Sequence, residues 1–147
     1  MIERQLVFLD FQAKDSEDFL NRISHILYKK HYVKDTFKEA IKKREEKFPT
    51  GLELETLKVA IPHTDSIHVL KPRVVFVRFK TPIDFKRMDG KGNIKVSMAF
   101  VLLVTNKINQ LPLLQKLIEI LSNNEVIERL GNENEENIIK ILGDELL

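Results

Sequence analysis

The chain has 147 residues, 43% of them hydrophobic and 31% charged, a composition typical of a folded domain with a sizeable core. It has no cysteine, which excludes disulfides, thiolate metal sites and a cysteine nucleophile within the chain. The net charge of +2 does not indicate nucleic acid as a partner, and no apolar run is long enough to cross a bilayer. Glu3, Arg4 and Asp10 interrupt the first residues, which therefore lack the uninterrupted apolar core of a signal peptide. We therefore expect one cytoplasmic domain, residues 1–147.

The first third of the chain is predicted to contain one strand and two helices. Residues 4–11, "RQLVFLDF", are the bulky and branched residues typical of a strand. In residues 15–33 apolar side chains recur at helical spacing, and Asp15 is a natural N-cap. Residues 34–48 show the same spacing, and the Pro-Thr-Gly sequence that follows is expected to end this second helix.

Strand patterns dominate the middle of the chain. Residues 56–61, "TLKVAI", precede Pro62, and residues 73–79, "RVVFVRF", alternate in polarity. An Asp-Gly pair at 89–90 between strand-like flanks predicts a hairpin. Residues 96–104, "VSMAFVLLV", are almost continuously apolar, as expected of a central strand that is covered on both faces.

Three helices are predicted after this strand. Residues 111–122 place Pro112 in the first turn of a helix, where proline is well tolerated. Ser122 and Glu125 have capping-box spacing at the start of the next helix, and residues 136–147 form the last one. The alternation of strands and helices predicts an α/β fold, a mixed β-sheet flanked by helices on both faces.

His63 is the first candidate for a functional residue. It follows Pro62 in "VAIPHTDSIH", just past the end of a predicted strand and beside a polar loop. Ligand sites in open α/β sheets collect at the carboxyl ends of strands. Proline restricts its own backbone and that of the residue before it, so the imidazole is expected to be presented from a rigid base.

The residues around His63 leave several interpretations open. A metal site would have only His63, Asp65 and His68 as nearby ligands, without a helical His-x-x-x-His pair. A serine hydrolase would need a G-x-S-x-G sequence, which is absent. An ordinary loop histidine and a nucleophilic histidine that carries a phosphoryl group both remain.

A phosphoryl-carrying histidine needs an unprotonated ring nitrogen, a fixed tautomer and a nearby cation. Arginine suits phosphate oxygens best because its planar fork donates two parallel hydrogen bonds. Arg44, in "KKREEKFPTG" near the end of the second predicted helix, is the candidate. The alternative is that Arg44 belongs to an ordinary solvated, charged helix face.

Two segments, "AIKKREEKFPTGL" and "VAIPHTDSIHV", resemble the Arg-Glu segment and the Pro-His active-site segment of one bacterial family. This family comprises the enzyme IIA domains of the phosphoenolpyruvate-dependent sugar phosphotransferase system, in the fructose–mannitol superfamily. The resemblance extends over essentially the whole chain. The sequence of residues 48–69, "FPTGLELETLKVAIPHTDSIHV", is most similar to the galactitol-type branch. It implies the mannitol-type enzyme IIA fold and a cytoplasmic phosphocarrier that needs neither a cofactor nor a metal.

The resemblance also implies roles for individual residues. His63 matches the histidine that receives a phosphoryl group from phospho-HPr. In the family this histidine passes the group to a cysteine of enzyme IIB, and enzyme IIB acts with a membrane IIC permease. Arg44 matches the arginine that stabilises the phosphoryl charge, and Glu45 completes the Arg-Glu pair without an assigned role. Thr64 is placed to donate a hydrogen bond to the phosphoryl group. His68 is interpreted as a loop residue.

One position departs from the pattern of the superfamily. Many members carry a second active-site histidine at the start of the helix after the long apolar strand, where this chain has Gln110 in "QLPLL". A glutamine amide can donate a hydrogen bond to a phosphoryl oxygen but cannot act as a cation or take a proton. Ile61, Ile67 and Leu111 are candidates for an apolar ring around the site, or else for core packing.

Two other functions remain open at this stage. The same fold serves as a regulatory module that signals its phosphorylation state to a transporter, a kinase or a transcription factor. A degenerate domain that binds partners without being phosphorylated is a further alternative, for which Gln110 is the only support. The sequence does not identify the sugar or the oligomeric state.

Overall fold

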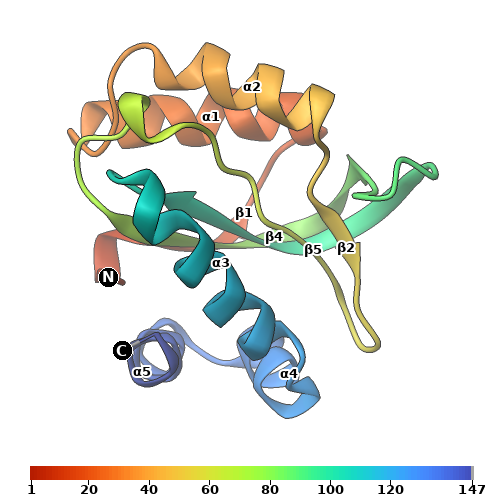
Figure 1. Cartoon of the computed structure of the whole chain (residues 1–147). Helices are drawn as coiled ribbons and strands as arrows, with labels where there is room; N and C mark the ends of the chain where they lie inside the picture. Colours follow the sequence, from red (N-terminus) through yellow and green to blue (C-terminus); the bar gives the residue numbers. More distant parts are fainter. Residues whose placement is uncertain (147) are drawn as a thin grey trace.

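The computed structural model describes residues 1–146 and has a five-stranded sheet between two layers of helices (Figure 1). The strands are β1 (Val7–Phe11), β2 (Gly51–Glu53), β3 (Lys58–Ala60), β4 (Arg73–Lys86) and β5 (Asn93–Leu103). The helices are α1 (Ser16–Lys29), α2 (Phe37–Lys47), α3 (Lys107–Leu121), α4 (Asn124–Asn132) and α5 (Glu135–Glu145), with short 3-10 helices η1 (Arg4–Leu6) and η2 (Ser66–His68). No helix within residues 1–146 is long and apolar enough to span a membrane.

The sheet is mixed, as predicted, and its order is β1-β4-β5-β3-β2. β1 pairs parallel with β4, β4 antiparallel with β5, β5 parallel with β3, and β3 antiparallel with β2. The long apolar strand β5 lies in the middle, and its residues 98–103 are all buried. Its central place confirms the interpretation of this run as a strand that is covered on both faces.

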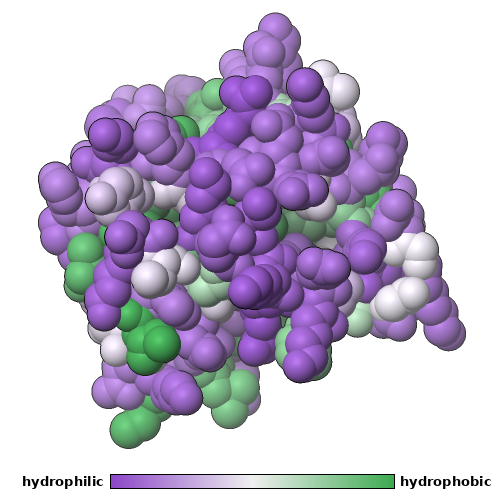
Figure 2. All heavy atoms as spheres, turned by 90° about the horizontal axis from the view of Figure 1, so that it is seen from above, coloured by the Kyte–Doolittle hydropathy of each residue, from purple (hydrophilic) through white to green (hydrophobic). Residues whose placement is uncertain are grey.

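Two hydrophobic cores occupy the two faces of the sheet. One contains apolar side chains of α1 and α2, among them Phe19 and Phe37, and the other contains those of α3, α4 and α5 together with Phe76 and Phe100. Figure 1 shows α1 and α2 on one side of the strands and the last three helices on the other. The outer face of the α1–α2 layer is mostly hydrophilic (Figure 2), as expected of amphipathic helices whose apolar stripes face the sheet.

Several local predictions are confirmed. The Asp15 carboxylate caps α1 by accepting a hydrogen bond of 2.8 Å from the backbone N–H of Asp18. The hairpin between β4 and β5 turns at the predicted Asp-Gly pair, and both Gly90 and Gly92 have positive φ, of 77° and 88°. Glycine is suited to this turn because it adopts positive φ at no steric cost.

Other boundaries differ from the prediction. Residues 4–6 form η1 rather than part of a strand, because the N–H of Leu6 bonds back to the carbonyl of Glu3. Strand β2 was not predicted at all, and its three residues are too few to show a periodic pattern. β2 is set by its pairing with β3 rather than by its own composition.

The predicted starts of α3 and α4 are wrong. α3 begins at Lys107, because the Asn106 side chain accepts from the N–H of Ile108, and Pro112 therefore lies in the second turn rather than the first. α4 is capped by Asn123, whose side chain accepts from Val126 N–H. The Ser122 hydroxyl instead bonds the carbonyl of Ile118 in the preceding helix.

Candidate active site

His63 lies just past the C-terminal end of β3, as predicted. Its backbone forms a parallel bridge to Leu102 near the end of β5, and the Leu102 N–H donates a 3.1 Å hydrogen bond to the Pro62 carbonyl. The histidine is thus attached to the edge where the central strand ends and the chain turns toward α3. This is the carboxyl edge at which ligand sites in α/β sheets are found.

The ring of His63 is half-buried and is held by a hydrogen bond to its own loop. Its Nδ1 atom lies 2.7 Å from the carbonyl oxygen of Ile61. A carbonyl only accepts hydrogen bonds, so Nδ1 carries the proton in the neutral ring and Nε2 keeps its lone pair. Desolvation by burial, together with the nearby charge of Arg44, lowers the pKa of His63 below its ordinary value. The imidazole is therefore neutral and nucleophilic at physiological pH.

Arg44 lies in the last turn of α2, with its guanidinium carbon 4.7 Å from the centroid of the Phe48 ring. Its charge is near enough to His63 to act on the pKa of that ring. The Nε atom of Arg44 is buried without a hydrogen-bond partner, and no carboxylate within residues 1–146 forms an ion pair with it. A buried guanidinium donor without a protein partner suits an anion.

Glu45 is buried next to Arg44, which the sequence patterns did not predict. One carboxylate oxygen accepts from the Thr50 N–H and the other from the Thr50 hydroxyl, both at 2.7 Å. Burial raises the pKa of Glu45 to about 7, although the bonds from Thr50 and the charge of Arg44 act in the opposite direction. The signal in the sequence was an acid placed five residues before a Thr-Gly pair, at the point where the helix must end.

The other candidates lie around the same edge with different exposures. Thr64 is buried, and Gln110 lies half-exposed in the first turn of α3. Within residues 1–146, neither side chain makes a hydrogen bond to His63 or Arg44. Ile67 and Leu111 are 63% and 61% exposed. Ile61 is fully buried, so of its two alternatives core packing is the one that the structure shows.

His68 is not paired with His63. Its Nδ1 lies 2.8 Å from the hydroxyl oxygen of Thr36, which fixes η2 against the start of α2. Across residues 1–146 no group of three or more histidine, aspartate or glutamate side chains has the arrangement of a metal site.

Comparison with known proteins identifies the family. The family model described as "Phosphoenolpyruvate-dependent sugar phosphotransferase system, EIIA 2" matches residues 1–145. The chain belongs to this family. Enzyme IIA components transfer phosphoryl groups, so the chain is a phosphotransferase component of that system, as the resemblance of its two motifs predicted.

Individual relatives agree with this assignment. The galactitol-specific EIIA component of Escherichia coli K12 is 33% identical over 116 residues, which cover 79% of this chain and 77% of that protein. The nitrogen regulatory protein IIA-Ntr of Neisseria meningitidis has a TM-score of 0.76 at 26% identity, covering 96% of this chain and 95% of that one. A complex of the E. coli mannitol enzyme IIA with phosphorylated enzyme IIB has a TM-score of 0.77 at 22% identity, covering 98% and 99%. The predicted mannitol-type fold is thereby confirmed.

Proposed function

We propose that His63 carries the phosphoryl group on Nε2, accepting it from phospho-HPr and passing it to a cysteine of an enzyme IIB. The observation that carries this proposal is the imidazole of His63, held at Nδ1 by the Ile61 carbonyl and near enough to Arg44 to feel its charge, while the buried Nε of Arg44 has no hydrogen-bond partner. The Nε2 lone pair attacks phosphorus while the phosphorus–nitrogen bond to the HPr histidine breaks. In the second step the IIB thiolate attacks phosphorus, and the Nε2–phosphorus electrons return to the ring.

Arg44 supplies the positive charge in both steps. The reaction moves a phosphoryl group between two side chains, so positioning and stabilisation of the oxygen charges provide most of the rate enhancement. The arginine donors are directed at the equatorial oxygens, where charge is spread in the transition state. Thr64 and Gln110 are the further hydrogen-bond donors to these oxygens in this proposal, and Glu45 is not a donor because both of its oxygens accept.

We further propose that the system takes up a galactitol-type sugar through a membrane IIC permease, with this chain acting in the cytoplasm. The galactitol-specific relative at 33% identity supports this choice. A regulatory role is the second candidate, favoured by the likeness to a nitrogen regulatory IIA protein at 26% identity. Transfer from the phosphorylated chain to a galactitol-type IIB cysteine supports uptake, whereas stable phosphorylation without transfer to that IIB supports regulation.

Phosphotransfer from radiolabelled phosphoenolpyruvate through enzyme I and HPr tests the central assignment. We expect acid-labile labelling of the wild type and none of His63→Ala. His25→Ala, which changes an exposed histidine on α1, is the matched control and should label normally. His68→Ala tests the rival histidine and should also label. Label retained by His63→Ala would refute the assignment.

A further inference from the structure

A continuous path of hydrogen bonds connects the end of α2 to the imidazole of His63. The Glu45 carboxylate accepts both the N–H and the hydroxyl of Thr50, each at 2.7 Å. The same hydroxyl oxygen accepts the N–H of Ile61 at 3.2 Å. The carbonyl of Ile61 in turn accepts Nδ1–H of His63 at 2.7 Å. Ile61 is thus fixed on both sides, through its N–H by Thr50 and through its carbonyl by His63.

The path is buried along its length up to the ring. Glu45 is 7% exposed, Thr50 3% and Ile61 0%. A carboxylate in such a place costs stability unless it is fully bonded, and an apolar side chain of similar size would often be better tolerated. The acid satisfies both of its oxygens on a single residue, Thr50. An interaction this specific constrains geometry more than it adds stability.

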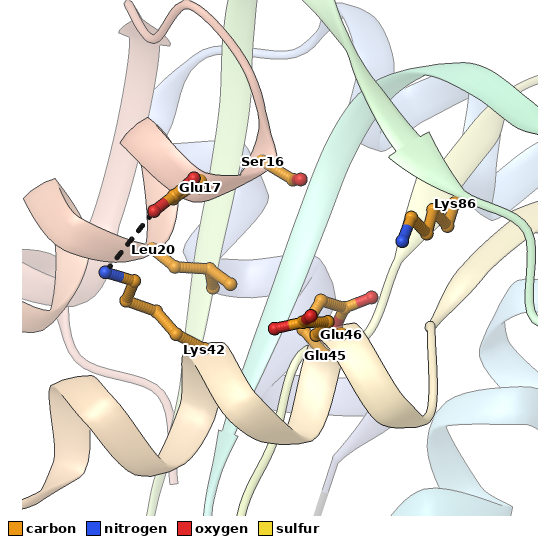
Figure 3. A pocket seen from close by; sticks show the side chains of 7 residues that line it. All are labelled: Ser16, Glu17, Leu20, Lys42, Glu45, Glu46 and Lys86. Carbon is orange, nitrogen blue, oxygen red and sulfur yellow. Dashed lines mark ion pairs between the residues drawn. The ribbon is translucent and has the colours of Figure 1, made fainter.

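The surroundings of Glu45 show that it is held by Thr50 and not by a salt bridge. It lines a cavity of about 320 Å³ between α1, α2 and the end of β4. Figure 3 shows the side chains around this cavity. Lys42 in this cavity is paired with Glu17 at 3.5 Å, and Lys86 projects from β4. Neither lysine forms an ion pair with Glu45 among residues 1–146. Glu45 lines this cavity, while Thr50 occupies both of its carboxylate oxygens.

We propose that Glu45 is a positioning residue for His63, acting through Thr50 and the backbone of Ile61 to hold the imidazole in the tautomer that exposes Nε2. The inference rests on the proposed role of His63 as phosphoryl carrier. If Thr50 loses its anchor, the Ile61 N–H loses a well-placed acceptor, and the carbonyl that orients Nδ1 is held less firmly. The ring then samples the other tautomer and other orientations, in which Nε2 is protonated or misdirected.

Two substitutions break the path at different points, and two controls accompany them. Glu45→Met removes both acceptor oxygens while retaining length, and Thr50→Val removes the hydroxyl while retaining shape. Glu46→Met makes the same change at the exposed neighbouring residue of the same cavity. Thr50→Ser keeps the hydroxyl and should therefore preserve the hydrogen bonds from Glu45 to Ile61.

The first measurement is the tautomer of His63, from nitrogen-15 shifts of the ring, which needs no phosphoryl transfer. We expect one tautomer, protonated at Nδ1, in the wild type, Thr50→Ser and Glu46→Met, and a mixture in Glu45→Met and Thr50→Val. The second measurement is the rate of transfer from phospho-HPr. In Glu45→Met and Thr50→Val, kcat should fall about 10- to 100-fold with little change in KM. The reason is that the nucleophile is misplaced while the docking surface is intact.

An unchanged tautomer and an unchanged kcat in folded Thr50→Val would overturn the proposal. If Glu45→Met fails to fold, Thr50→Val decides alone, since it keeps shape and removes one hydroxyl. A rise in KM with kcat preserved would also overturn it, because that result assigns the path to docking. Failure of the proposed function is recognised separately, by label that survives in His63→Ala.

Discussion

The Nδ1 atom of His63 lies 2.7 Å from the carbonyl oxygen of Ile61, two residues earlier in the same loop. The backbone therefore does what a carboxylate does for many catalytic histidines: it fixes the tautomer and directs the other nitrogen outward. It does so without placing a negative charge beside the ring, which would raise the pKa of the imidazole. The ring stays neutral, and under the proposed function the charge of Arg44 is left for the phosphoryl group.

Arg44 should matter for transfer far more than for folding. Arg44→Gln removes charge-assisted hydrogen bonds worth about 1.5 to 3 kcal/mol, so transfer from phospho-HPr should slow about 10- to 100-fold. Arg44→Lys keeps the charge but loses the planar fork and should fall between this variant and the wild type. Lys43→Gln, at an exposed position on the same helix, is the control. Rates in Arg44→Gln equal to those of the control would remove Arg44 from the site.

The titration of His63 should lie below the ordinary value of 6.5. Burial is the larger cause and Arg44 the smaller, so Arg44→Gln should raise the pKa only part of the way back. Carbon-13 shifts of the ring followed against pH measure both values. Phosphoryl acceptance should decline only as the pH falls through the lowered pKa. A wild-type pKa at or above 6.5 would contradict the account.

Glu45 should impose a pH dependence on stability. Its pKa rises from 4.5 to about 7 on folding, so between these values the folded chain binds more protons than the unfolded one. The free energy of unfolding therefore falls as the pH rises through this window, by about 3 kcal/mol in total. The charged groups around Glu45 are Arg44, Lys42 and Glu46 on α2, Glu17 on α1 and Lys86 on β4.

Urea unfolding at several pH values tests this dependence. Subtracting the curve of Glu45→Gln from that of the wild type isolates the contribution of the carboxyl group. We expect the wild type to lose stability relative to Glu45→Gln from pH 4.5 to pH 7 and to show no further change above. A difference that is flat across this window would show that the carboxylate is not penalised by burial.

Gly51 should not tolerate a side chain. A Cβ atom there would lie 2.6 Å from the carbonyl oxygen of Lys86, a backbone atom that cannot turn away. Gly51→Ala should therefore destabilise the fold by about 1 to 3 kcal/mol. Gly143, in α5, has no atom beyond its chain neighbours and the nearby backbone of its own helix within 4 Å of the position that a Cβ would take, so Gly143→Ala should stabilise by about 0.5 to 1 kcal/mol. The Tm of Gly51→Ala should fall below that of the wild type and the Tm of Gly143→Ala should rise above it. Shifts of both Tm values in the same direction would contradict this prediction.

Features coded within a few neighbouring residues could be predicted from the sequence. Asp15 caps α1 because the cap needs only its own side chain and the N–H three residues on. The apolar run of β5 also predicted a central strand, because a continuous stretch of apolar residues is visible in the sequence itself. His63 was predicted to lie at a strand end because it follows a strand-like run and a proline. Arg44 was a candidate because a phosphoryl group needs a nearby cation, and the motif resemblance then implied its role.

Competition between neighbouring signals could not be resolved from the sequence. Ser122 and Asn123 are both good caps, and Asn123 prevails because α3 continues to Leu121 and uses the Ser122 hydroxyl at its own C-terminal end. Pro112 signals a helix start, yet Asn106 caps the helix earlier. The Thr50–Ile61 hydrogen bond depends on where β2 and β3 bring the chain back, which only the assembled sheet determines.

The nitrogen that carries the phosphoryl group tests the central claim most directly. Wild-type protein labelled with nitrogen-15 on histidine and phosphorylated through HPr can be studied by phosphorus–nitrogen NMR. The account predicts a single phosphohistidine, with phosphorus coupled to Nε2 of His63 and with Nδ1 still protonated toward the Ile61 carbonyl. Phosphorus coupled to Nδ1 of His63, or to a nitrogen of His68, would contradict it.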